Sequence, residues 1–190
     1  MPIHSQQTTQ SVDEETFKLA MRQLPAAVSI VTTGTDAMHR AGLTATAVCS
    51  VSATPPQILV CVNQQANANA QIRAFANFCV NVLSDNQIPI AKQFAGMEGG
   101  TQEERFSQAK WRTLETGAPA LEGSLLSLDC RLREEVRSGT HSIFIGEIVA
   151  IALNPERQAL AFRDGQFLSI HRPRKSQSPP VELDWDWEWN

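Results

Sequence analysis

Four of the five hydroxyl-bearing residues in the segment 42–56 (GLTATAVCSVSATPP) stand out. They are Thr44, Thr46, Ser50 and Ser52, and small side chains stand between them. Hydroxyls and backbone amides beside small residues can line a slot for a flat ring with a polar edge, which needs several hydrogen bonds. The same alternation also occurs on a solvated strand face, so these residues leave both interpretations open.

Other patterns that carry chemistry are missing from the sequence. It has no glycine-rich phosphate loop and no Gly-x-Ser-x-Gly elbow. The four cysteines are widely spaced without a Cys-x-x-Cys pair, which predicts buried thiols. No two of the four histidines lie at ligand spacing, so we expect no metal site. His141 follows a turn in GTHSIFIGEI, where a histidine by itself is more often a solvated side chain.

Length and composition set the class of protein. The chain has 190 residues and a mass of 20.9 kDa, which predicts one domain with its own core. Its net charge of −4 and isoelectric point near 5.6 disfavour nucleic acid and anionic membranes as partners. It has no apolar run of membrane-spanning length, and the polar start of the chain lacks an export signal, so we expect a cytoplasmic protein.

The first half of the chain predicts alternating strands and helices. Acidic residues at 13–15 precede apolar residues at helical spacing, which indicates a helix that ends before Pro25. The segments 26–33 and 41–53 are rich in β-branched residues and predict a hairpin. Further along we expect a strand at 57–63, a helix from Asn67, a strand at 78–84 and a short helix at 87–94.

The second half predicts mainly strands. The segment 96–113 is polar and glycine-rich, and we expect a mobile excursion there, anchored by Phe106 and Trp111. Strands are predicted at 125–136 and 141–153, and a last hairpin at 160–170 around its Asp-Gly pair. Six to eight strands with three short helices predict a β-rich fold (all-β or α+β), a barrel of mostly antiparallel strands with flanking helices.

Three regions are expected along the chain: an arm at 1–12, the barrel domain at 13–171, and a tail at 172–190. The tail begins with a basic, proline-rich linker and ends in VELDWDWEWN, where three tryptophans alternate with acidic residues. This alternation suits a docking strand that adds to a sheet edge, and a loosely packed tail remains an equal alternative.

The chain resembles the short-chain flavin reductases of two-component monooxygenases, whose fold is an FMN-binding split barrel. The resemblance runs from Phe17 to about Ile170 in several segments whose order and spacing agree. It looks closest to the reductase component of 4-hydroxyphenylacetate 3-monooxygenase, through AAVSIVTT, TATAVCSV and FAGMEG, and to the flavin reductases of pyrimidine catabolism. Other matching segments include FKLAMRQLPAAVSIVTT, AGLTATAVCSVSATPPQILVCVN, EERFSQAKW and GTHSIFIGEI.

The resemblance implies roles for particular residues. His141 would position the nicotinamide. The flavin would meet residues of four segments. These are Thr44, Ala45 and Thr46 at the isoalloxazine edge, Ser50, Val51 and Ser52 along the ribityl and phosphate side, Cys61, Val62 and Asn63 through backbone and amide groups, and Asn69 and Phe75 at the phosphate end. Lys92 and Arg163 are further candidates for phosphate contacts, and either could be an ordinary surface cation.

The resemblance also implies an activity. It suggests an NAD(P)H:flavin oxidoreductase that binds FMN or FAD and takes hydride from NADH or NADPH. Reduced flavin would then diffuse to a separate oxygenase, and a homodimer would form each flavin site. A non-catalytic FMN-binding electron carrier or sensor on the same barrel is the alternative. A pyridoxamine phosphate oxidase-like enzyme fits less well, because the sequence lacks the clustered Arg and Lys that such a site uses for phosphate.

Overall fold

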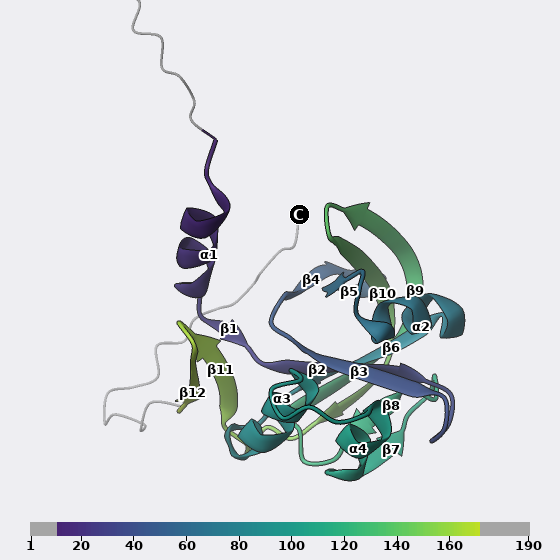
Figure 1. Cartoon of the computed structure of the whole chain (residues 1–190). Helices are drawn as coiled ribbons and strands as arrows, with labels where there is room; N and C mark the ends of the chain where they lie inside the picture. Colours follow the sequence, from purple (N-terminus) through teal and green to yellow (C-terminus); the bar gives the residue numbers. More distant parts are fainter. Residues whose placement is uncertain (1–10, 172–190) are drawn as a thin grey trace, which may run out of the picture.

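A seven-stranded antiparallel sheet curls into a barrel and forms the body of the protein (Figure 1). This computed structural model describes residues 11–171, so the predicted tail and most of the predicted arm lie outside the described residues. The order of strands in the sheet is β3-β2-β6-β9-β10-β5-β4. Its members are β2 (Ser29–Gly34), β3 (Arg40–Ala45), β4 (Val48–Ala53), β5 (Pro56–Asn63), β6 (Asn77–Val82), β9 (Leu126–Ser138) and β10 (His141–Leu153).

Smaller elements surround this sheet. Two minor sheets are formed by β1 (Ala26–Ala27) with β11 (Ala159–Arg163) and β12 (Gln166–Ile170), and by β7 (Trp111–Thr113) with β8 (Pro119–Leu121). The helices are α1 (Glu14–Arg22), α2 (Asn67–Phe75), α3 (Ile88–Phe94) and α4 (Gln102–Ser107), with a 3₁₀ turn η1 (Asp85–Gln87). The predicted β-rich class with antiparallel strands and flanking helices is confirmed.

The barrel is split between β3 and β4, which are consecutive in the chain but occupy opposite edges of the sheet. The short connector Thr46–Ala47 crosses from one edge to the other, and the Cys61 amide donates to the Ala47 carbonyl at 3.0 Å. The prediction of a single strand at 41–53 was therefore wrong. Only β3 pairs with β2, whereas β4 pairs with β5, because the chain changes edges at the connector.

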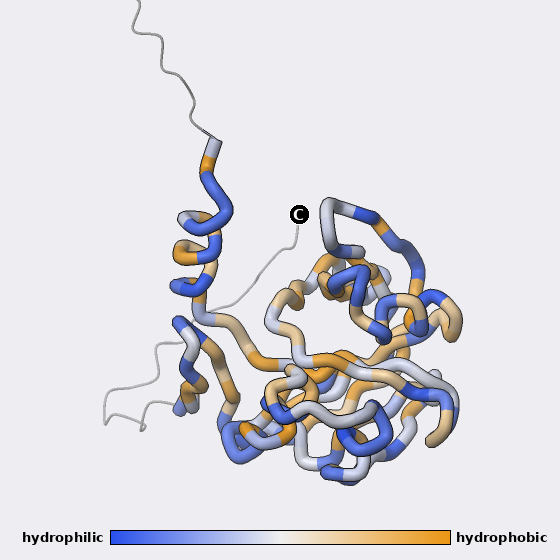
Figure 2. Tube along the Cα trace, in the orientation of Figure 1, coloured by the Kyte–Doolittle hydropathy of each residue, from blue (hydrophilic) through white to orange (hydrophobic). Residues whose placement is uncertain are grey.

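Apolar side chains fill the barrel and the space between it and the helices α3 and α4. Val60, Phe78 and Phe144 are fully buried inside the barrel. A Cβ atom on Gly146 would lie 2.4 Å from the Phe78 ring, so only glycine lets this ring pack against β10. Figure 2 shows the contrast between these apolar strands and the hydrophilic outer half of β9, which leads to the tip of the β9–β10 hairpin.

The segment 96–113 is more regular than its composition predicts. Thr101 and Glu104 form a capping box that begins α4, a signal that the glycine-rich composition obscured. The two predicted anchors are correct: the ring of the buried Phe106 lies 5.0 Å from that of Phe94 and 4.8 Å from that of Trp111. The expected excursion is therefore wrong in part, since its middle is a short helix.

A layer of buried polar residues underlies β6. The Asn81 side chain accepts from the Leu121 amide and from the Ser127 hydroxyl, both at 2.8 Å. Asp129 accepts from the Thr116 amide at 2.7 Å. These contacts fix the segment 113–121 across the sheet, so both faces of β6 are buried. We call this set the buried polar layer, and its members are Thr32, Asn81, Thr116, Ser127 and Asp129.

Helix α1 stands off the barrel, and none of its residues is buried (Figure 1). It is attached at its end, where Arg22 pairs with Asp164 at 3.3 Å and the Asp164 amide donates to the Arg22 carbonyl at 2.7 Å. Asp164 and Gly165 both have positive φ angles, which confirms the predicted Asp-Gly hairpin turn. Within residues 11–171, no helix is long and apolar enough to cross a membrane.

Candidate functional site

The ladder between β5 and β10 brings two separate sequence segments onto one face. His141 lies directly opposite Asn63, and Ile143 lies opposite Cys61. Paired residues in antiparallel strands project to the same side of the sheet, here the side away from the barrel core. Strand β4 extends this side by pairing Cys49 with Leu59. We call this surface the site face, and its members are Cys49, Leu59, Cys61, Asn63 and His141.

Two predicted site residues face the barrel interior instead. Val62 alternates with Cys61 and Asn63, and its side chain is fully buried in the core. Ala45 is also part of that core. Either residue can reach a ligand only through its backbone, because its side chain is occupied by packing.

A bulge in β4 separates the predicted serines. Ser50 pairs with Ile58 and Ser52 pairs with Gln57, so the register shifts by one residue at Val51. Ser52 therefore projects with the site face, whereas Ser50 projects to the other side. The Ser52 hydroxyl accepts from the Thr54 amide at 3.1 Å. The hydroxyls of 42–56 do not form one row, contrary to what a single strand would produce.

The two threonines of this segment also separate. Thr44 donates its hydroxyl to the Ala91 carbonyl at 2.6 Å, which ties β3 to α3 beside the exposed Lys92. Thr46 is exposed in the connector and lines a groove of about 450 Å³ between α1 and Phe162. Thr46 is therefore the hydroxyl of this pair that is free to meet a ligand.

The remaining predicted residues are spread around the barrel. Asn69 lies in the first turn of α2 and is fully buried, and its side chain donates to the Val62 carbonyl at 3.1 Å. Phe75 is half-buried about 9 Å further along the same helix. Arg163 donates to Gln23 at 3.2 Å, at the base of α1. The structure gathers the β5 and β10 residues with Asn69, but it leaves Lys92 and Arg163 on other elements.

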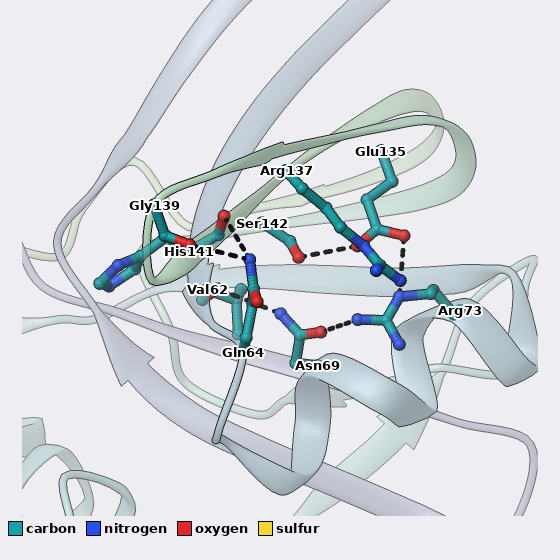
Figure 3. Close-up of polar contacts among 9 residues, drawn as sticks. All are labelled: Val62, Gln64, Asn69, Arg73, Glu135, Arg137, Gly139, His141 and Ser142. Carbon is teal, nitrogen blue, oxygen red and sulfur yellow. Dashed lines mark hydrogen bonds and ion pairs between the residues drawn. The ribbon is translucent and has the colours of Figure 1, made fainter.

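His141 is exposed, and the backbone around it is held by Gln64 (Figure 3). The Gln64 side chain donates to the Gly139 carbonyl at 3.3 Å and to the His141 carbonyl at 3.1 Å. Its backbone amide donates to the Thr140 carbonyl at 2.9 Å. The imidazole Nδ1 lies 2.9 Å from the Thr140 hydroxyl, which leaves the other ring nitrogen for a ligand.

A polar network lies on the other side of this hairpin, against α2. Glu135 accepts from the Ser142 hydroxyl at 2.7 Å and from Arg73 Nε at 2.8 Å, and Arg73 also donates to the Asn69 side chain. Partial burial alone would raise the pKa of Glu135, but these two hydrogen bonds and the arginine charges lower it below its usual value. We call this network the hairpin latch, and its members are Asn69, Arg73, Glu135 and Ser142.

Sequence reasoning missed Gln64, Arg73 and Glu135. Each is an ordinary polar residue in its own segment, and Arg73 and Glu135 are 62 positions apart. No local pattern could have linked them, because the contact exists only after α2 packs against the β9–β10 hairpin.

The site face suits a flat ring with a polar edge. Strand β4 is an edge strand, so one side of its backbone can donate and accept hydrogen bonds. The side chains beside it are small, which permits close approach of a ring. Within residues 11–171, no three His, Cys, Asp or Glu side chains gather as a metal site. The arrangement therefore fits an isoalloxazine ring that stacks on the sheet beside His141.

Comparison with known proteins identifies the family of the chain. The model of the flavin reductase like domain matches residues 21–171. The FMN reductase (NADH) RutF of Enterobacter cloacae is 43% identical over 161 residues, which cover 85% of this chain and 96% of RutF.

Two solved structures share the fold. The protein ycdh of Haemophilus somnus 129pt superposes with a TM-score of 0.80 and 41% identity, over 84% of this chain and all of that chain. BorF, the flavin reductase component of a bacterial two-component tryptophan halogenase, superposes with a TM-score of 0.77 and 30% identity, over 85% of this chain and all of that chain. The predicted enzyme class, an NAD(P)H:flavin oxidoreductase, is confirmed, and the chain belongs to the flavin reductase like family.

Proposed function

We propose that this protein is an FMN reductase that uses NADH and releases reduced flavin to a separate flavin-dependent monooxygenase. The observation that carries the proposal is the site face, where His141 on β10 lies directly opposite Asn63 on β5, and β5 pairs on its other side with the edge strand β4. Candidate residues for the nicotinamide and for the flavin thus share one surface. The names of the two compared reductases support the choice of FMN and NADH and the two-component arrangement.

The chemistry needs positioning more than acid or base catalysis. Hydride passes from the nicotinamide to the flavin, and the two rings themselves supply the reactive atoms. The residues of this chain would hold the rings in contact and exclude water between them. The edge backbone of β4 would bind the polar edge of the flavin, and the free ring nitrogen of His141 would orient the nicotinamide.

An open site suits a flavin that must leave after reduction. Cys49, Val51 and His141 are all exposed, so a bound ring would remain accessible from solvent. Release then needs no large conformational change. Because reduced flavin must diffuse to the oxygenase, both enzymes would share one compartment, and we keep the cytoplasm as our expectation.

A homodimer is part of the proposal. Phe17 and Leu24 on and beside α1 are more than half exposed, and this apolar surface stands beside the groove that contains Thr46. A second copy packed there would cover the exposed apolar area and approach the flavin edge.

The partner oxygenase is the least defined element of the proposal. Segments of this chain resemble reductases that serve 4-hydroxyphenylacetate 3-monooxygenase, and BorF serves a tryptophan halogenase. RutF, which is 43% identical to this chain against 30% for BorF, is named only for its reaction with FMN and NADH. We therefore propose a flavin-dependent oxygenase without naming its substrate, and FAD remains the alternative flavin.

The proposal is tested by steady-state turnover with both flavins and both nicotinamides. Purified protein with NADH and a large excess of FMN should bleach flavin absorbance at 450 nm over many turnovers, faster than with FAD or NADPH. Reduction of no more than one flavin per subunit would instead identify a flavin-binding electron carrier or sensor. A preference for FAD would correct the flavin and leave the reaction class intact.

A further inference from the structure

The hairpin latch closes a ring of contacts around the strand positions next to His141 (Figure 3). Glu135 binds Ser142 and Arg73, Arg73 binds Asn69, and Asn69 binds the Val62 carbonyl. Val62 is itself paired with Ser142 in the ladder between β5 and β10. The ring therefore connects β9, α2, β5 and β10 and returns to the residue that follows His141.

His141 has little else to hold it in place. Beyond Asn63 strand β5 ends, so within the described part of the chain the residues 138–140 project past the sheet with no strand beside them except their own hairpin. Gly139 turns the chain with a positive φ angle of 54°. The position of the His141 ring thus depends on Gln64 on one side of the hairpin and on the latch on the other.

We propose that Glu135 is a positioning residue, which holds the β9–β10 hairpin against α2 and thereby sets where His141 meets the nicotinamide. This inference rests on the proposed function. Glu135 suits the role because its two oxygens serve two elements at once: one accepts from Ser142 on the hairpin, and the other accepts from Arg73 on α2. Hydrogen bonds to a charged carboxylate are stronger than neutral ones.

The surroundings of the carboxylate make its contacts specific. Ser142 is fully buried, and the Glu135 side chain is only 17% exposed. Arg137 adds a longer contact of 3.5 Å to the oxygen that accepts from Ser142. If the carboxylate were lost, the buried hydroxyl of Ser142 would lose its acceptor and Arg73 would lose its partner on the hairpin. The hairpin tip could then shift relative to α2 without unfolding the barrel.

The informative variant is Glu135→Gln. The amide keeps the shape of the side chain but removes the charge, and its nitrogen cannot accept a hydrogen bond from Arg73. The matched control is Glu147→Gln, which removes another ion pair of the same hairpin, to Arg133 at 2.5 Å, without a partner on α2. Arg73→Ala is less selective, because Arg73 also binds Asn69 and the flavin end of the site would change too.

Steady-state kinetics with NADH and FMN measure the proposed role. We expect Glu135→Gln to raise the KM for NADH about fivefold, with the KM for FMN changed less than about twofold, while Glu147→Gln leaves both nearly unchanged. In a His141→Ala background, Glu135→Gln should have little further effect on the KM for NADH, because Glu135 acts through the contact between His141 and the nicotinamide. If Glu135 had a purely structural role, Glu135→Gln would change the KM for NADH by the same factor with or without His141.

Hydrogen exchange provides a readout that does not depend on catalysis. The amides of residues 138–142 should exchange faster in Glu135→Gln than in wild type or in Glu147→Gln. Turnover with an unchanged KM for NADH in Glu135→Gln would overturn the positioning role alone, as would fully multiplicative effects with His141→Ala. Unchanged exchange would show that the latch does not hold the hairpin. A wild-type protein without turnover would overturn the proposed function together with this inference.

Discussion

Two polar networks lie in different parts of the molecule, one between β6 and the segment 113–121 and the other between α2 and the β9–β10 hairpin. The buried polar layer under β6 is closed to solvent, and Asn81 and Asp129 within it are fully buried. The hairpin latch lies at the open end of β5 and β10, and Arg73 within it is 35% exposed. The first network attaches one part of the fold to another, whereas the second surrounds an exposed histidine. The two networks therefore differ in what they hold in place rather than in burial alone, because Asn69 and Ser142 of the hairpin latch are as fully buried as Asn81 and Asp129.

The largest effect is expected in the buried polar layer. Asn81→Ala would remove the acceptor of the buried Leu121 amide and one partner of the Ser127 hydroxyl, which would keep only its contact with the Ser124 hydroxyl. We expect a loss of about 3 kcal/mol or more in the free energy of unfolding, measured by urea denaturation.

The control for this prediction is Asn154→Ala. Asn154 is exposed and donates one hydrogen bond, to the Ser124 carbonyl at 2.7 Å, so its loss should cost about 1 kcal/mol or less. In the fraction of Asn81→Ala protein that remains folded, the KM for NADH should stay near its wild-type value. Equal stability losses in the two variants would remove the contrast between buried and exposed polar contacts.

The next effect is expected at His141, where substitution should change the KM for NADH more than the free energy of unfolding. His141→Ala should raise the KM for NADH about tenfold, equivalent to about 1.4 kcal/mol, and raise the KM for FMN less. The free energy of unfolding should change by about 0.5 kcal/mol or less, since the side chain is exposed and contacts only Thr140 among the hydrogen bonds described.

His39→Ala is the matched control for His141→Ala. His39 is an exposed histidine in the turn between β2 and β3, away from the site face. Both kinetic constants should stay unchanged in that variant. An unaltered KM for NADH in His141→Ala would take this residue out of the nicotinamide site.

The smallest effect is a difference in thiol reactivity between the two regions. Burial raises the pKa of Cys79 and Cys130 well above their ordinary value, and the nearby Asp129 charge adds to it. Burial raises the pKa of Cys61 as well, whereas Cys49 is exposed. Iodoacetamide at pH 8 should modify Cys49 first and Cys61 more slowly, and leave the two buried thiols until the protein unfolds.

Bound flavin should protect the two thiols of the site face from this modification. Saturating FMN should slow the modification of Cys49 and Cys61, measured by peptide mass spectrometry, because both lie on the site face. The same concentration of AMP, which lacks the flavin ring, serves as the control. Protection of neither cysteine by FMN would place the flavin away from this face.

Much of the fold could be predicted from local patterns. Periodicity located α1, α2 and α3, with acidic residues at the start of α1, and the Asp-Gly pair located the last hairpin turn. The segment 41–53 was predicted as one strand because its side chains are β-branched and small throughout. Nothing in those residues marks the point where the chain leaves one sheet edge for the other, so the resemblance implied a split barrel but the position of the split between β3 and β4 was not predicted.

The site was predictable only in part. Resemblance to a family predicted His141 and Asn63 as site residues, and the structure places these two residues opposite each other. The resemblance could not show that Val62 and Ala45 turn their side chains into the core. The face on which a strand residue lies depends on the register of the strand and on what covers the sheet. The roles of Gln64 and Glu135 were also hidden, because neither belongs to the segments that carry the family's pattern.

The sequence by itself determined the class of fold, the turns and the residues with chemical potential, because these depend on neighbours along the chain. The tertiary structure decided which of them meet. The β4 bulge sends Ser50 and Ser52 to opposite faces, and the ladder between β5 and β10 sets His141 beside Asn63. Packing of α2 against the hairpin pairs Arg73 with Glu135. Contacts between distant segments form only when the whole barrel closes, so they cannot be predicted from the local sequence.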